Sequence, residues 1–173
     1  MDPSKGSNMT EPGSPTPGFQ WTTINAVPLL PPGWSHQLVE IAERDSAFRL
    51  LETSSTTSRE ETPFLDIPSL TVDGELLNKG APWLYELYRG LFRNLAAEIV
   101  GTSVECAKED LYGAVLNVQR GSQMRYECHV DSNPLQGLLY VTSHAPGEGG
   151  ELAVAANPNA HSVKEVDADC DVI

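Results

Sequence analysis

The residues with the clearest chemical potential in this chain are His129 and Asp131, which stand two positions apart. In an extended strand such residues point to the same face, so an imidazole nitrogen and a carboxylate oxygen can reach one metal ion. A second histidine would complete the ligand set of non-haem Fe(II) centres, which leaves coordination positions open for O2. His129 and Asp131 are therefore predicted to be metal ligands and catalytic residues. A surface histidine beside a turn-forming aspartate is the alternative, because residues 131–134 read Asp-Ser-Asn-Pro.

Three short apolar runs around this pair predict the strands that would position it. They cover residues 112–118, 138–141 and 151–155, and turn-forming segments that contain glycine lie between them at 120–122 and 146–150. Short strands separated by turn signals are typical of a β-sandwich or barrel. We therefore expect the two candidate ligands to lie within a mainly β structure.

Taken together, these features resemble the Fe(II)/2-oxoglutarate dioxygenases of the prolyl-4-hydroxylase-like group. The shared order is a strand, a glycine turn, Tyr-x-x-His-x-Asp, Asn-Pro, a strand ending in tyrosine and then Gly-Gly-x-Leu. Within that group, HVDSNPLQGLLYVTSHAPGEGGELAVA is most similar to bacterial enzymes that hydroxylate or chlorinate free amino acids. The resemblance covers roughly residues 112–173 and is thin before them.

The resemblance implies a fold and a set of cofactors. The fold would be a double-stranded β-helix, or jelly roll, and the cofactors would be Fe(II), 2-oxoglutarate as cosubstrate, and O2. A distal histidine ligand and an arginine or lysine that clamps the 2-oxoglutarate carboxylate are expected beyond Ile173, so the chain would be the first part of a longer enzyme. His161 is a less favoured third ligand, because its spacing from Asp131 is shorter than in the family.

Three further residues match positions that approach the cosubstrate in the resembled family, namely Tyr126, Tyr140 and Gln119. In a regular strand Tyr126, three positions before His129, would face the opposite side, and a bulge would be needed to re-aim it. For both tyrosines, half-burial in a sheet is the alternative role, because tyrosine is a good strand residue.

The resemblance predicts a hydroxylase of a small metabolite, either a free amino acid or a derivative. Radical halogenases of the family carry Gly or Ala where this chain has Asp131, so hydroxylation is favoured over chlorination. The alternatives are a halogenase-related oxidase of the same family, a non-catalytic cupin-like metal-binding or structural module, and a hydrolytic zinc enzyme that uses His129.

The composition describes an acidic chain of 173 residues, enough for one domain with its own core. With 11 Lys and Arg against 24 Asp and Glu, the net charge is -13. This balance argues against nucleic acid as a partner, because phosphate binding needs clustered basic residues, and it disfavours anionic membrane surfaces. The three cysteines lack a CxxC spacing, and neither an apolar leader nor a membrane-length apolar run is visible. We therefore expect a cytoplasmic protein. Its small-molecule substrate is what the resemblance implies.

The proline-, glycine- and serine-rich residues 1–18 predict a disordered tail. Residues 19–173 are predicted to form one domain, with helical support at its N-terminal side followed by the first jelly-roll strands. The predicted fold class is mainly β with flanking helices (α+β), with the jelly roll incomplete at its C-terminal end.

Local signals before the site predict a short strand over residues 26–30 and a helix over residues 35–48. The clearest helix covers residues 82–100, with Pro82 at its first turn and Gly101 just past its end. The polar stretch 52–62 predicts a solvated connection, for which a mobile lid over the site is the functional alternative.

Overall fold

The computed structural model describes residues 22–52, 58, 66–109, 113–121, 124, 126, 128–131, 133, 135–145, 147–150, 152–155 and 170–172. The predicted disordered tail, residues 1–18, lies outside the described residues, and so does His161.

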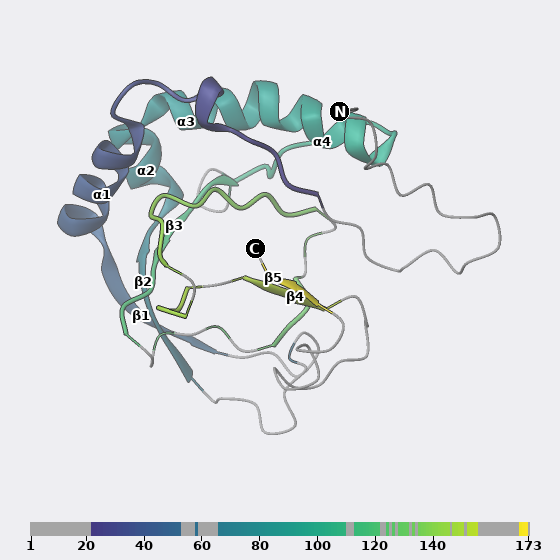
Figure 1. Cartoon of the computed structure of the whole chain (residues 1–173). Helices are drawn as coiled ribbons and strands as arrows, with labels where there is room; N and C mark the ends of the chain where they lie inside the picture. Colours follow the sequence, from purple (N-terminus) through teal and green to yellow (C-terminus); the bar gives the residue numbers. More distant parts are fainter. Residues whose placement is uncertain are drawn as a thin grey trace, which may run out of the picture.

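The described part of the chain combines helices with two small antiparallel sheets, which is the α+β class. The larger sheet has the order β1-β2-β3 (Figure 1), with β1 over Ala47–Glu52, β2 over Asp66–Val72 and β3 over Leu116–Val118. A second sheet pairs β4, Ala153–Ala155, with β5, Cys170–Val172. Because only five short strands are described, the jelly-roll core stays a prediction at this point.

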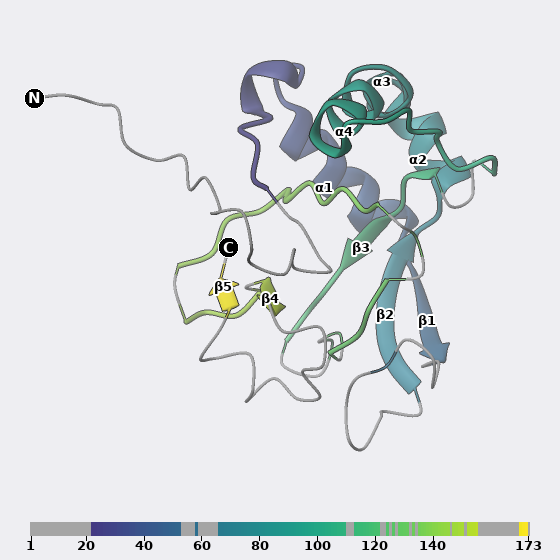
Figure 2. The same cartoon turned by 90° about the vertical axis from the view of Figure 1, so that its right-hand side faces the viewer.

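The helices lie together at one end of the three-stranded sheet in both views (Figures 1 and 2). They are η1 (Val27–Leu29), α1 (Trp34–Asp45), α2 (Gly74–Gly80), α3 (Pro82–Leu87), the π-helical turn η2 (Tyr88–Phe92) and α4 (Arg93–Val100). None of the described helices is long and apolar enough to cross a membrane.

The hydrophobic core forms where these helices meet the end of β2. Its buried members are Leu38 and Ile41 of α1, Val72 of β2, Leu77 of α2, and Ala81. Each large apolar side chain buried in this way contributes about 1.5–3 kcal/mol relative to exposure. Half-buried residues complete the cluster, namely Trp34, Trp83, Leu84, Ala114, Leu116 and Val141. The core therefore unites the helices with β3 and with the segment that follows the candidate metal ligands.

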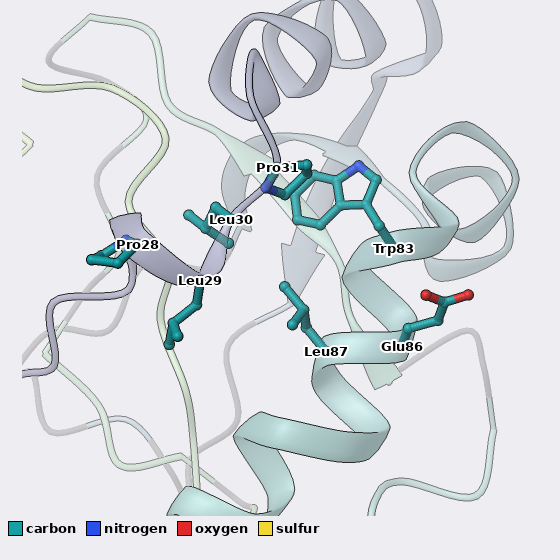
Figure 3. A pocket seen from close by; sticks show the side chains of 7 residues that line it. All are labelled: Pro28, Leu29, Leu30, Pro31, Trp83, Glu86 and Leu87. Carbon is teal, nitrogen blue, oxygen red and sulfur yellow. The ribbon is translucent and has the colours of Figure 1, made fainter.

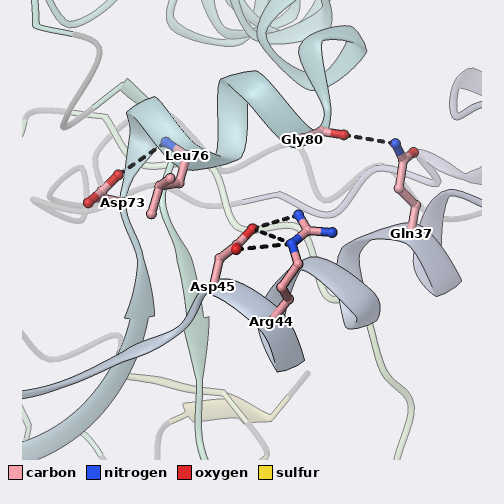
Figure 4. A network of polar contacts seen from close by, with 6 residues as sticks. All are labelled: Gln37, Arg44, Asp45, Asp73, Leu76 and Gly80. Atoms are coloured by element: carbon pink, nitrogen blue, oxygen red, sulfur yellow. Dashed lines mark hydrogen bonds and ion pairs between the residues drawn. The ribbon is translucent and has the colours of Figure 1, made fainter.

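Polar contacts fix how α2 follows the sheet (Figure 4). The side chain of Asp73 accepts a hydrogen bond from the backbone N–H of Leu76 at 3.1 Å, which satisfies one of the free donors at the start of α2. At the other end of α2, the side-chain amide of Gln37 donates to the carbonyl of Gly80 at 2.9 Å. Asp73 is thus the N-cap of α2.

The prediction of a helix over residues 82–100 is confirmed, with an internal irregularity. Helices α3 and α4 are joined without interruption by the π-helical turn η2, and Gly101 ends the segment with φ 70°. Tyr85 of α3 is buried, whereas α4 has no buried residue among those described. Beyond the π-helical turn, the apolar residues Ile99 and Val100 at the end of α4 are exposed.

Two predictions in the first half of the chain are wrong. Residues 27–29 form the helical turn η1 instead of a strand, because Pro28 lacks a backbone N–H and its fixed φ suits the first turn of a helix. The helix predicted over residues 35–48 ends at Asp45, and the chain continues as β1, whose Phe48 pairs with Leu70 of β2. Phe48 fits the helical period of α1, and pairing with a distant strand overrides that period.

The strands predicted around the site are shorter than expected or absent. Of the described residues 113–118 only Leu116–Val118 form a strand, and of the described residues 152–155 only Ala153–Ala155 do. Residues 138–141 are described and form no strand. Leu138 is 65% exposed and only Val141 packs on the core. An apolar run becomes a strand only where another strand satisfies its backbone hydrogen bonds.

Candidate functional site

The structure places the two predicted metal ligands side by side. Nε2 of His129 lies 3.3 Å from Oδ1 of Asp131, and the two side chains are 35% and 47% exposed. The site is therefore open to solvent and to small molecules. Val130, the residue between them, is also exposed.

This separation fits two neighbouring coordination positions on one ion. Donor atoms that each lie about 2.1 Å from a divalent ion are about 3.0 Å apart at a right angle and about 3.4 Å apart at a tetrahedral angle. The observed 3.3 Å falls between these values. It also fits a direct ion pair between an aspartate and a protonated histidine, so the distance alone does not select the metal.

Within the described residues, no group of three or more His, Cys, Asp or Glu side chains is placed to hold a metal ion. The sequence predicts that His129 and Asp131 are two of the three protein ligands that a non-haem Fe(II) site requires. The third ligand and the carboxylate clamp stay predictions, as does the metal role of the pair itself.

Tyr126 lies next to this pair. Its ring centroid is 6.0 Å from that of His129, with an interplanar angle of 44°, and the tyrosine is half-buried. Residues three apart in a regular strand would face opposite sides. The described residues between 124 and 131 form no regular strand, and this irregular backbone brings the two rings together.

The other two predicted cosubstrate residues lie on separate segments. Gln119 is exposed directly after β3, and Tyr140 directly precedes Val141, which packs on the core. Burial of its ring raises the pKa of Tyr140 above the ordinary value for a phenol. For both residues the contact with a cosubstrate stays a prediction.

One residue near the candidate ligands has no local sequence signal. Ser58 forms an isolated antiparallel β-bridge with His129. It belongs to the connection between β1 and β2, which the sequence predicts to be a solvated loop or a lid, and of residues 53–65 it is the one described. Only knowledge of a homologous structure or of co-varying positions could have revealed this pairing.

A second histidine–carboxylate pair provides a useful comparison. On α1, Nε2 of His36 lies 3.4 Å from Oε1 of Glu40, four residues later, with side chains 79% and 60% exposed. His36 is a surface residue, as the sequence predicts. His144, the remaining described histidine, is exposed and contacts the Thr142 hydroxyl at 3.2 Å.

A shallow groove of about 360 Å³ lies elsewhere, between η1 and α3 (Figure 3). Six of its seven lining residues are apolar by type, Leu29, Trp83 and Leu87 among them, and the seventh is Glu86. No residue of the candidate metal site lines it. The groove and the His129–Asp131 pair are therefore separate features.

Comparisons of the chain with protein-family models, with curated proteins and with solved structures find no match.

Proposed function

We propose that this chain belongs to an Fe(II)/2-oxoglutarate-dependent oxygenase that hydroxylates a small, amino-acid-like metabolite in the cytoplasm. The proposal includes a jelly-roll core, to which the antiparallel sheets β1-β2-β3 and β4-β5 would belong. The observation that carries it is the 3.3 Å separation of His129 Nε2 and Asp131 Oδ1, whose side chains are both accessible to solvent.

The chemistry of the donor set supports this proposal. Imidazole and carboxylate suit iron, and two or three protein ligands leave positions for a chelating cosubstrate and O2. When bound, iron with 2-oxoglutarate and O2 supplies the oxidation, while the protein binds, orients and excludes water. The carboxylate of Asp131 fills the position that a halide would need, and this favours hydroxylation over halogenation.

The side chains of this segment have distinct roles in the proposal. His129 would bind the metal through a ring nitrogen and Asp131 through a carboxylate oxygen. The Tyr126 ring packs beside the imidazole at 6.0 Å between centroids and would limit its rotation. Tyr140 and Gln119 would approach the cosubstrate.

The test is an anaerobic titration of the protein with Fe(II) and then with 2-oxoglutarate, monitored by visible absorption. We expect a weak charge-transfer band that requires both additions. Asp131→Asn should abolish the band, because it removes an anionic ligand and keeps the shape of the side chain.

Glu40→Gln is the matched control, since it makes the same chemical change in a histidine–carboxylate pair of nearly the same separation, 3.4 Å. It should leave the band intact. Bound iron without a band in the wild type, or a band of full strength in Asp131→Asn, would overturn the proposal.

A non-catalytic metal-binding or structural module is the second candidate. The observation that favours it is that the described residues bring together two candidate ligands and no third. This module would bind Co(II) or Zn(II) weakly through His129 and Asp131 and would give no band with 2-oxoglutarate. The same titration therefore separates the two candidates.

A further inference from the structure

Ser58 and His129 are far apart in the sequence and opposite each other in the structure. Their antiparallel bridge sets the backbone at Ser58 opposite the backbone at His129. Ser58 is half-buried at this place. The bridge is isolated, so it acts at this one position and not along a ladder of strand pairs.

The bridge also determines where the Ser58 side chain points. Directly opposed residues of an antiparallel pair project to the same face, with Cβ atoms about 4.5–5.5 Å apart. Asp131 shares the face of His129, because the two side chains meet at 3.3 Å. This pairing geometry predicts that the Ser58 hydroxyl stands on the face that carries both candidate ligands.

We propose that Ser58 is a positioning residue of the candidate metal site: its backbone bridge holds the main chain of His129, and its hydroxyl lies beside the imidazole on the ligand face. This inference rests on the proposed metal-binding role of His129 and Asp131. Groups that orient a ligating histidine strengthen metal binding, and their loss typically weakens it by about 10–100-fold. A serine is also small enough to leave room for the ion and its remaining ligands.

The geometry predicts a gain of binding. In Ser58→His, a second imidazole would stand on the ligand face and complete a set of two imidazoles and one carboxylate. We expect Co(II) affinity, measured by titration of the Co(II) visible absorption in the full chain, to rise at least about tenfold. The gain should disappear when Asp131→Asn is combined with Ser58→His.

Val130→His is the matched control. It introduces the same side chain next to His129, and neighbouring residues of an extended chain point to opposite faces, so affinity should not change. Equal affinities of Ser58→His and Val130→His would overturn the placement of Ser58. A tenfold gain in Ser58→His alone would support it even if the wild type gave no band with Fe(II) and 2-oxoglutarate, so this inference and the oxygenase proposal fail separately.

Two milder variants test the positioning role. Ser58→Pro removes the backbone N–H and should weaken Co(II) binding by about tenfold and alter the Co(II) absorption spectrum. Ser58→Thr keeps the bridge and the hydroxyl, so its Co(II) affinity and absorption spectrum should match those of the wild type. Wild-type affinity and spectrum in Ser58→Pro, with the circular dichroism of the fold unchanged, would show that the bridge does not position His129.

Discussion

Gln37 connects three helices through one side chain, and its removal should measurably loosen the helical layer. Its Oε1 accepts from Nε1 of Trp83 at 2.9 Å, and its Nε2 donates to the carbonyl of Gly80 at 2.9 Å. Gln37→Leu removes both bonds and keeps most of the side-chain volume. At about 1 kcal/mol net for each hydrogen bond, the free energy of unfolding should fall by about 2 kcal/mol. All groups involved are only partly buried, so water can reach them and the larger penalty for sealed polar groups does not apply.

Thermal unfolding followed by circular dichroism measures the effect, with an expected fall in Tm of about 4–8 °C for a chain of this size. The matched control is His36→Leu, which makes a similar change at the adjacent, exposed position and should stay within about 0.5 kcal/mol of the wild type. Gln37→Glu should fall between the two, because a carboxylate still accepts from Trp83 but cannot donate to Gly80. Equal stabilities of Gln37→Leu and His36→Leu would refute the connecting role of Gln37.

Further substitutions test the glycines and a tyrosine. A Cβ at Gly80 would lie 2.8 Å from Cδ1 of the buried Ile41, so Gly80→Ala should cost about 1–3 kcal/mol by urea denaturation. Gly101 has φ 70°, so Gly101→Ala should lower stability by about 1–2 kcal/mol. Gly90 lies in a helical turn with open space around a new Cβ, so Gly90→Ala should raise stability by about 0.4–1 kcal/mol. A higher Tm in Gly101→Ala than in Gly90→Ala would contradict these two predictions. Partial burial raises the pKa of Tyr140 in the folded protein, so the stability that this tyrosine contributes is complete below the pKa of the unfolded chain and is lost as pH rises through the pKa of the folded one. Tyr140→Phe should therefore remove a phenol that ionises late in an ultraviolet titration. Loss of an early-ionising phenol would contradict this prediction.

The sequence predicts elements whose signals are local. The helix over residues 82–100 has Pro82 at its start and Gly101 at its end, and both boundaries agree with the structure. Its π-helical turn could not be predicted, because the apolar spacing alone does not distinguish a regular helix from one with an extra residue in a turn. Strand β1 was missed because its residues also satisfy a helical period, and only its pairing with β2 decides the outcome.

The same division between local and distant information applies to the candidate site. The two-residue spacing of His129 and Asp131 is visible in the sequence, and the structure places their donor atoms together. The approach of Tyr126 depends on an irregular backbone, which strand periodicity does not anticipate. The pairing with Ser58 joins segments with no shared local pattern, so periodicity could place that serine in a loop but not beside a ligand.

Two histidine–carboxylate pairs of the described residues share this short separation, and backbone support distinguishes one of them from the other. The His36–Glu40 and His129–Asp131 pairs have almost the same separation, 3.4 Å and 3.3 Å. The first lies on a solvated helix face, where such pairs contribute about 0.3–0.5 kcal/mol and both side chains can turn away. The second is fixed on one side by the bridge to Ser58 and packs against the ring of Tyr126. Ligands that are held in place before the ion arrives lose less conformational freedom on binding, so metal affinity should follow the supported pair and not the equally close one.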